Sequence, residues 1–404
     1  MECFNSPLVD FPEWPPVNDE EIIILIDQLK IGKAPGPDLI IPEVLKADPE
    51  WWAPLLATLF TMVNKTGQIP VAWRNATIVP IYKKGCHLNP ANYRPINLLS
   101  IIGKLYAKHL QIKLNDWMLS CKILGPEQIG FSQGKSAIDH CLVLSHLIGK
   151  FSRRKRSKLY TAFLDLKGAF DSVSRGLLWE KLESTSLDKR LLFLIKRLYT
   201  YTSCQVRCST SGRLSSKIIT NKGVKQGCIL APFLFNLFLN DLVPFLSSVD
   251  GHSPRLGSIH VPLLSYADDV VLLSVSRVGL KSLLNRFCEY CVINHLDLNY
   301  EKSKVMVFSN SRKLYDWNIK GNNLEQVKHF KYLGVYFQFN ASWTCHWKMA
   351  INTAKISASA IARFYFSERG NQYVPAALKA FNAKNRSSVI IWCAPLDRSN
   401  EYLR

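Results

Sequence analysis

Three aspartates occupy settings in which a carboxylate is costly. Asp165 lies near the end of the apolar stretch Ala162–Leu166, and Asp268 and Asp269 lie between two apolar runs of the segment Val261–Leu273. Burying a charged carboxylate is unfavourable unless it is paired or bound to a metal. An aspartate pair at a hairpin tip also has a simpler explanation, since aspartate is a common turn residue. The same anomaly in two separate strands favours a chemical role.

If both strands belong to one sheet, the three carboxylates converge and repel one another, and divalent cations would make the cluster tolerable. Hard Mg²⁺ prefers carboxylate and phosphate oxygens. Two ions about 3.5–4 Å apart stabilise the attacking and leaving oxygens of phosphoryl transfer. We therefore expect Asp165, Asp268 and Asp269 to bind two Mg²⁺ ions, or Mn²⁺ in their place. Attack of a 3′-hydroxyl on a nucleoside triphosphate is a reaction of this class.

The elements that position these carboxylates can be read from hydrophobic periodicity and turn residues. Strands are expected at 76–82 and 159–166, and hairpins at 76–96, with basic residues near its tip, and at 261–275. A helix start is expected at Asn18–Glu21, and helical character at 98–119, 137–148, 173–198, 350–365 and 375–383. Strands interleaved with helices predict an α+β fold.

Composition limits the partners. The 404 residues suffice for two or three packed subdomains, and 51 lysines and arginines against 31 acidic residues give a net charge of +20. Such an excess indicates a polyanionic partner. A membrane is not expected, because no apolar run of about 18 residues or secretory leader is found. The chain is therefore expected to be intracellular, in nucleus and cytoplasm.

The cysteines and one basic run give limited information about metal binding and partners. Eleven scattered cysteines indicate reduced, mostly buried thiols. The only CxxC, Cys288 to Cys291, lies in a helix-like stretch without a second Cys/His pair, so no structural zinc is expected. The basic run Ser152–Lys158 is a solvated loop, a nuclear-import signal or a nucleic-acid contact.

Taken together, these motifs resemble the reverse transcriptases of non-LTR (LINE-type, jockey-like) retrotransposons. Eight blocks in order carry the resemblance, from residue 33 to residue 335. They are Lys33-Ala34-Pro35-Gly36-Pro37-Asp38, Asn92-Tyr93-Arg94-Pro95-Ile96, Gln128-Ile129-Gly130-Phe131, Phe163-Leu164-Asp165-Leu166-Lys167-Gly168-Ala169-Phe170-Asp171, Gly223-Val224-Lys225-Gln226-Gly227-Cys228, Tyr266-Ala267-Asp268-Asp269, Leu298-Asn299-Tyr300-Glu301-Lys302-Ser303-Lys304 and Tyr332-Leu333-Gly334-Val335.

The resemblance implies RNA-directed DNA polymerisation, with an RNA template, a DNA primer and dNTPs as partners. It implies that Asp165 and Asp268 are metal ligands with Asp269 beside them. Phe170 would face the sugar of the nucleotide and exclude a 2′-hydroxyl; ordinary core packing is the alternative. Gln226 and Gly227 would form the turn that contacts nucleotide and template.

Further roles follow from the same resemblance. Lys83 and Arg94 would neutralise the triphosphate, although Lys84 could replace Lys83. Lys302 would protonate the pyrophosphate leaving group, or is simply solvated. Tyr332 and Gly334 would belong to the turn that grips the primer end. Independently of the family, Lys33 lies in a Pro/Gly-rich loop that could follow a phosphate backbone or be a plain connector.

The implied fold is a right-hand polymerase: fingers, a palm with an antiparallel sheet, and a short helical thumb. The boundaries we expect are a linker or truncated edge at 1–18, fingers at 19–158, a palm at 159–336 with a fingers insertion near 196–222, and a thumb-like region at 337–404. The oligomeric state is not predicted.

Some positions depart from the family pattern. Ser132 and Lys135 stand where family members often have arginine, so one basic contact is missing and another is weakened. Neither the endonuclease that usually precedes this polymerase nor the Cys/His module that often follows it is visible. A catalytically inactive nucleic-acid-binding relic of a decayed element is therefore the alternative, and an RNA-templated RNA polymerase is a third possibility that Phe170 disfavours.

Overall fold

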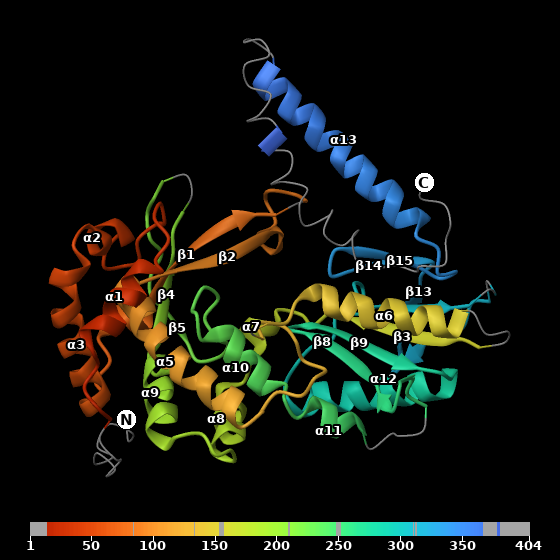
Figure 1. Ribbon diagram of the computed structural model, residues 1–404, viewed down its shortest axis with the longest axis horizontal. Coiled ribbons are helices and arrows are strands. Elements are labelled where there is room, and N and C mark those ends of the chain that lie inside the picture. The colour runs from red at the N-terminus through yellow and green to blue at the C-terminus, as the bar shows by residue number, and fades with distance from the viewer. Residues whose placement is uncertain are drawn as a thin grey trace. The chain divides into compact units, whose positions relative to one another are not determined.

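The computed structural model describes residues 14–83, 85–132, 134–152, 157–208, 211–247, 252–309, 311, 313–366 and 378–379, and Figure 1 labels its elements. Contacts between residues divide the chain into two units. The first unit comprises Met1–Gly125, Lys167–Asp241 and Val292–Asp297, and the second comprises Pro126–Leu166, Leu242–Cys291 and Leu298–Arg404. Each unit thus joins segments that are far apart in the sequence.

The first unit is largely helical. Its helices are α1 (Asp19–Asp27), α2 (Pro42–Ala47), α3 (Pro49–Thr66), α4 (Val71–Arg74), α5 (Ile101–Ser120), α7 (Ala169–Ser172), α8 (Arg175–Glu183), α9 (Lys189–Tyr199) and α10 (Ala231–Phe238), and a 3₁₀ turn, η1, covers Pro90–Asn92. Side-chain caps explain where several begin, because they satisfy the free N–H groups of the first turn. Asn18 accepts the N–H of Glu20 at α1, and Ser100 accepts that of Gly103 at α5.

A four-stranded sheet completes the first unit. Its strands are β1 (Asn75–Tyr82), β2 (Tyr93–Leu99), β4 (Thr202–Val206) and β5 (Ile218–Thr220), in the order β2-β1-β4-β5. β1 and β2 form the expected antiparallel hairpin, with Tyr82 opposite Tyr93, whereas β1 and β4 are parallel. The hairpin predicted around the basic residues is therefore confirmed.

The second unit is built on a five-stranded sheet in the order β13-β10-β3-β9-β8. Its strands are β3 (Leu159–Leu164), β8 (Leu263–Tyr266), β9 (Asp269–Ser274), β10 (Lys304–Phe308) and β13 (Glu325–Gln326). The short strands β6 (Arg255–Leu256), β7 (Ile259–His260), β11 (Asn318–Ile319), β12 (Asn322–Asn323), β14 (His329–Tyr332) and β15 (Val335–Gln338) form three further pairs. The helices are α6 (Ala137–Ser152), α11 (Leu242–Ser247), α12 (Arg277–Ile293) and α13 (Thr344–Phe366).

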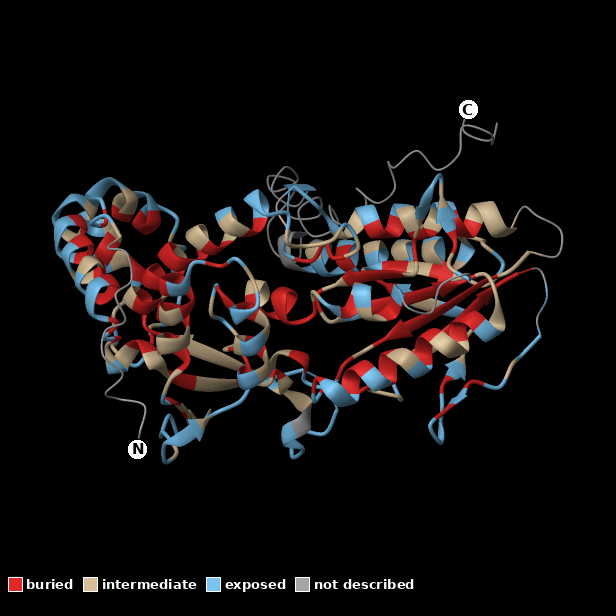
Figure 2. Ribbon diagram, turned by 90° about the horizontal axis from the view of Figure 1, so that it is seen from below, coloured by how far each residue is buried: buried red, intermediate tan, exposed pale blue. Residues whose placement is uncertain are grey.

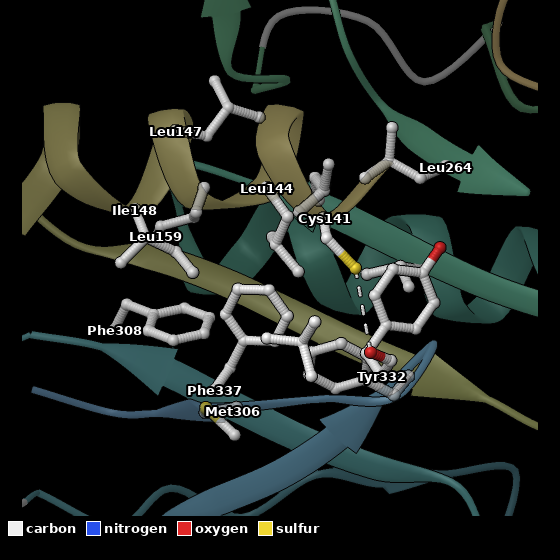
Figure 3. Close-up of a cluster of buried hydrophobic side chains, with 14 of the residues drawn as sticks. Cys141, Leu144, Leu147, Ile148, Leu159, Leu264, Met306, Phe308, Tyr332 and Phe337 are labelled. Carbon is white, nitrogen blue, oxygen red and sulfur yellow. Dashed lines mark hydrogen bonds between the residues drawn. The ribbon is translucent and has the colours of Figure 1, made fainter. Parts of the chain in front are cut away.

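All six residues of β3 are buried, as expected for a central strand covered on both faces. Figure 2 colours most of this sheet as buried. Leu159 and Phe163 point into a core formed with α6 and the β14–β15 hairpin, which Figure 3 shows in close-up. α12 lies beneath the sheet in Figure 1, with α6 above it. The core therefore holds β3 rigidly up to the residue before Asp165.

The predicted elements agree with the structure except in a few places. Helical character at 173–198 was predicted without a break, whereas two helices, α8 and α9, are present. The five residues between them are rich in serine, threonine and aspartate, which favour caps and turns over helix interiors, and Asp188 caps α9 by accepting the N–H of Leu191 at 2.7 Å. The last expected helix, 375–383, lies outside the described residues apart from 378–379, as do Lys84 and residues 153–156 of the basic run. No helix in the described parts of the chain is long and apolar enough to cross a bilayer.

Candidate active site

Two of the three predicted carboxylates are neighbours across β3 and β9. These strands pair antiparallel, with Phe163 opposite Val271 and Leu164 opposite Val270. The next residues along this register are Asp165 and Asp269. Because opposite residues of an antiparallel pair point to the same face, both carboxylates share the face of the sheet that bears Phe163. Strand register therefore brings Asp165 and Asp269 to the same end of the sheet.

Asp268 lies in the turn of the β8–β9 hairpin. Tyr266 pairs with Asp269, which leaves Ala267 and Asp268 as a two-residue turn. Ala267 has φ +54°, in the left-handed region that glycine adopts most readily. Hairpin turns of this length need a positive φ to match the twist of their strands. A buried alanine in that conformation must be held by its surroundings.

The segment Gln128 to Gly130 holds this turn in place. The Gln128 side chain accepts the N–H groups of Ala267 (3.2 Å) and Gly130 (3.0 Å) through Oε1, and donates to Ser265 Oγ (2.9 Å) through Nε2. Gly130 packs directly on the turn, and a Cβ there would lie 2.4 Å from the backbone N of Ala267. Glycine at 130 is therefore required by close backbone approach.

Asp165 is held by a loop that follows α12 in the chain. Its N–H donates to Ser303 Oγ (3.1 Å), and its carbonyl accepts the N–H of Asn299 (2.8 Å). Its carboxylate atom Oδ2 accepts Asn299 Nδ2 at 3.0 Å and lies 3.3 Å from Lys302 Nζ. Both backbone groups and one carboxylate oxygen of Asp165 are therefore fixed by residues 299–303.

The pKa of Asp269 reflects its burial and the proximity of the other two carboxylates. Burial, together with the charges of Asp268 and Asp165, raises the pKa of Asp269 to about 6. Within the described ranges, no three His, Cys, Asp or Glu side chains are gathered closely enough to form a metal-binding cluster. The charges of Asp268 and Asp165 thus act on Asp269, although the three side chains do not form a metal-binding cluster.

Phe170, Gln226 and Gly227 belong to the first unit. Phe170 is half-buried and stacks on Phe235 with ring centroids 4.7 Å apart. Gln226 Nε2 donates to Asp171 Oδ2 at 3.1 Å, and burial raises the pKa of Asp171. Gly227 is exposed with φ +100°. These residues form one local arrangement, in which the aromatic ring and the glutamine are held by the neighbours of their own unit.

The basic residues predicted to contact nucleic acid or triphosphate are on the surface. Lys33, Lys83 and Arg94 are all exposed, the last two near the end of the β1–β2 hairpin. Lys225, next to Gln226, behaves differently. Its Nζ donates to the carbonyls of Trp73, Arg74 and Leu198, and burial lowers its pKa to about 8. Lys225 therefore anchors the loop that contains Gln226 to other segments of the first unit.

Tyr332 and Gly334 lie at the tip of the β14–β15 hairpin. Leu333 and Gly334 both have positive φ, which identifies a tight two-residue turn. The Tyr332 side chain is buried: its hydroxyl lies 3.3 Å from His140 Nδ1, and its carbonyl accepts the Cys141 thiol (Figure 3). Gly334, in the turn itself, is exposed.

Comparison with known proteins identifies the family. The family model described as "Reverse transcriptase (RNA-dependent DNA polymerase)" matches residues 81–337, which include all three aspartates. The chain belongs to the reverse transcriptase family. The α+β, right-hand polymerase fold expected from the sequence is the fold of this family, and its members generally use divalent metal ions.

Named relatives are mobile-element polymerases. The chain is 28% identical over 371 residues to the probable RNA-directed DNA polymerase from transposon BS of Drosophila melanogaster, covering 86% of this chain and 38% of that protein. It is 28% identical over 343 residues to the RNA-directed DNA polymerase from mobile element jockey of Drosophila funebris, covering 82% and 36%. This reverse transcriptase chain spans about a third of the length of the curated relatives it matches. The resemblance to the jockey-like branch is confirmed.

Among solved structures, the chain resembles apo telomerase from Candida tropicalis truncated from its C-terminal domain. The identity is 14% and the TM-score 0.46, with 68% of this chain and 55% of the other covered. A likeness at this level supports no conclusion about function.

The site of this reverse transcriptase contains residues that sequence reasoning did not select. Asn299 binds the Asp165 carboxylate, Gln128 and Gly130 hold the turn that bears Asp268, and Asp171 accepts a hydrogen bond from Gln226. All four lie inside blocks that carried the resemblance. Their membership of those blocks was the sequence signal that could have identified them. The blocks did not indicate which residues they contact.

The residues at this sheet edge fit divalent cations by their chemistry. Carboxylate oxygens are the ligands that Mg²⁺ prefers, and the charges of Asp268 and Asp165 contribute, after burial, to the raised pKa of Asp269. The donor chemistry of Asp165, Asp268 and Asp269 is therefore compatible with the divalent metal ions that the family generally uses.

Proposed function

We propose that this chain is an RNA-directed DNA polymerase of a non-LTR retroelement, which joins a dNTP to a primer 3′-hydroxyl. The observation that supports the proposal is the β3–β9 register, which ends with Leu164 opposite Val270, one residue before Asp165 and one after Asp269, beside the turn that bears Asp268. In a chain that belongs to the reverse transcriptase family, these three aspartates are the proposed catalytic residues.

In the proposed reaction, Asp165, Asp268 and Asp269 hold two Mg²⁺ ions, or Mn²⁺ in their place. When bound, the ions stabilise the attacking 3′-hydroxyl oxygen and the pyrophosphate leaving group. Asn299 and Gln128 keep the carboxylates oriented, and water is displaced by nucleotide and duplex. Lys302, whose ammonium group is exposed beside Asp165, is suited to donate a proton to the leaving pyrophosphate.

The remaining predicted residues are proposed to bind the substrates. Phe170 selects deoxynucleotides by excluding a 2′-hydroxyl, and its stacking on Phe235 gives the ring a fixed position. Gln226 and Gly227 contact nucleotide and template, and Lys83 and Arg94 contact the triphosphate. Gly334, in the turn after Tyr332, contacts the primer end.

The composition of the sheet in the first unit supports an RNA template as partner. Lys33 is proposed to bind nucleic acid as well. No aspartate or glutamate occurs between residues 51 and 115, nor between 189 and 240, so β1, β2, β4, β5 and both hairpin loops lack acidic residues. Arg213, Lys217 and Lys222 are exposed on or beside the β4–β5 hairpin. A surface with cations and no carboxylates attracts a phosphate backbone of any sequence.

We retain the subdomain boundaries as part of the proposal: fingers at 19–158, palm at 159–336 and thumb at 337–404. The same holds for a nuclear and cytoplasmic location. Residues 367–377 and 380–404 of the thumb lie outside the described part of the chain. The inactive relic is not favoured, because the family model and the relatives are RNA-directed DNA polymerases.

The test is primer extension on an RNA template with dNTPs and Mg²⁺. The wild-type chain should extend the primer, and Asp268→Ala should abolish extension because one of the three carboxylates is lost. Asp116→Ala, which removes an exposed aspartate on α5, should leave extension unchanged. Equal extension by wild type and Asp268→Ala would contradict the proposal, and tight RNA binding without extension would favour the relic.

A further inference from the structure

Asp165 Oδ2 receives two donors of different kinds from one short loop. Asn299 Nδ2, at 3.0 Å, is a neutral amide. Lys302 Nζ, at 3.3 Å, is an ammonium group. Both groups contact the same carboxylate oxygen. This carboxylate is proposed above to bind a metal, so its two neighbours must either help or oppose that binding.

Asn299 is fixed on all sides. Its backbone N–H donates to the Asp165 carbonyl at 2.8 Å, and its own carbonyl accepts the N–H of Ser303 at 2.9 Å. Its side-chain Oδ1 accepts the N–H of Lys302 at 3.3 Å, which orients the amide so that Nδ2 faces Asp165. An amide anchored at both ends restricts the rotation of the carboxylate without adding charge.

Lys302 is held much more loosely. Its side chain is 65% exposed, and the described structure gives its Nζ one ion-pair partner, Asp165. A lysine side chain is flexible, and an exposed ion pair contributes little free energy. Its positive charge neutralises the carboxylate and repels any other cation nearby. The ammonium group and a divalent cation therefore oppose each other at Asp165.

We propose that Asn299 is a positioning residue that orients the Asp165 carboxylate for metal binding, whereas Lys302 is an exchangeable counter-ion that competes with the metal for it. This inference rests on the proposed function, because it concerns the same carboxylates. Removing the two neighbours of a single oxygen should change metal affinity in opposite directions. Residues with merely structural roles would both weaken binding.

The experiment is a titration of the full chain with Mn²⁺, without nucleic acid or nucleotide, in which the electron paramagnetic resonance signal of free Mn²⁺ reports binding. Asn299→Ala should weaken Mn²⁺ affinity about 10- to 100-fold, as loss of a residue that orients a metal ligand commonly does. Lys302→Met should tighten it about two- to fivefold, the value of an exposed ion pair.

Matched variants separate these effects from folding and from net charge. Asn299→Ser keeps an acceptor for the N–H of Lys302 but is too short to reach Asp165, and it should weaken affinity as Asn299→Ala does. Lys328→Met removes an exposed lysine of the same unit for which the described structure shows no side-chain hydrogen bond or ion pair. It should leave Mn²⁺ affinity unchanged. Thermal melting of each variant verifies that it is folded.

The outcomes distinguish this inference from the proposed function. Binding by wild type that Asp268→Ala removes confirms the carboxylates as the metal site. If that result is obtained but Asn299→Ser and Lys302→Met change affinity in the same direction, or not at all, only the present inference is overturned. If wild type and Asp268→Ala bind Mn²⁺ equally, the proposed metal site and this inference both fail.

Discussion

Gly130 is the residue whose size most directly limits the turn that carries Asp268. A methyl group at this position would lie 2.4 Å from the backbone N of Ala267 and 3.2 Å from Gln128 Oε1. Neither a backbone atom nor an anchored glutamine can give way cheaply. The turn that carries Asp268 would therefore have to move.

Gly130→Ala should reduce turnover about 100-fold, because a displacement of about 1 Å at a reacting centre has an effect of that size. RNA binding should change little. Steady-state primer extension and RNA titration measure the two effects. Gly149→Ala is the matched control: it lies in α6 with no atom within 4 Å of the added Cβ, and should preserve activity while stabilising the fold by about 0.5–1 kcal/mol. Full turnover by Gly130→Ala would show that the turn tolerates displacement.

Residue-level prediction was possible where the signal was local. Asp165, Asp268 and Asp269 could be selected because charged residues stood out in apolar strands. Asn299 and Gln128 could not, since their partners lie 134 and 137 residues away in the sequence. A polar residue in a polar loop gives no local sign that it supports a carboxylate in another segment.

At the scale of elements, α1, α3 and α5 are joined by a buried polar network. His109 Nδ1 lies 2.6 Å from Glu21 Oε1, and its Nε2 lies 3.2 Å from Asn64 Nδ2. Asn64 Oδ1 accepts the hydroxyl of Tyr106 at 2.9 Å. If Asn64 donates to His109 Nε2, then His109 carries its proton on Nδ1 and donates it to Glu21, and every group is satisfied.

This network makes the stability of the helices depend on pH. The hydrogen bond from His109 lowers the pKa of Glu21, burial opposes this effect, and the charges of His109 and Lys113 add to the lowering. A carboxylate whose pKa is lowered on folding stabilises the protein above its unfolded pKa, and this contribution is lost as pH falls through the folded pKa.

Glu21→Gln should therefore lower the free energy of unfolding by about 1 kcal/mol at neutral pH, the value of one partly buried hydrogen bond. The difference from wild type should shrink as pH falls below about 4.5. Thermal melts between pH 7 and pH 3 measure it. Glu20→Gln, an exposed neighbour, should have no such effect. A difference that stays constant with pH would exclude the carboxylate as its cause.

Element boundaries could be predicted where caps and periodicity agree. Asn18 and the acidic residues after it predicted the start of α1, and continuous apolar stretches predicted β1, β3 and the β8–β9 hairpin. The continuous helix at 173–198 was wrong because Asp188 caps a new helix, and capping residues were outweighed by the apolar periodicity on both sides. The parallel pairing of β1 with β4, more than a hundred residues apart in the chain, had no local signature.

At the scale of the whole molecule, the net charge of +20 is unevenly distributed. The sheet of the first unit has no acidic residue in its strands or hairpin loops, as described above. Its cations are therefore not neutralised by local partners and remain available to a polyanion. Affinity for RNA should fall steeply as salt increases, since counterions are released on binding.

Arg213→Ala combined with Lys217→Ala should make the plot of log affinity against log salt less steep by about 1.4, or roughly 0.7 for each phosphate of single-stranded RNA that the variant no longer neutralises. Fluorescence anisotropy at several salt concentrations measures this slope. Lys281→Ala combined with Lys328→Ala removes the same charge from the second unit and should alter the slope less. An unchanged slope in the first double variant would exclude this sheet from RNA binding.

The central position of β3 has a consequence during protein synthesis. It is the middle strand of its sheet and the first to be made. Its neighbour β9 follows about 100 residues later, so at roughly 5–20 residues per second β3 emerges from the ribosome about 5–20 s before that partner exists. Until then Leu159–Leu164, without a single charge, exposes both of its edges to other nascent chains. The basic run Ser152–Lys158 lies immediately before β3 in the sequence. Flanking charges of this kind oppose aggregation. The run that suggested nucleic-acid binding is thus also suited to protect β3, whose last residue precedes Asp165, while the chain is incomplete.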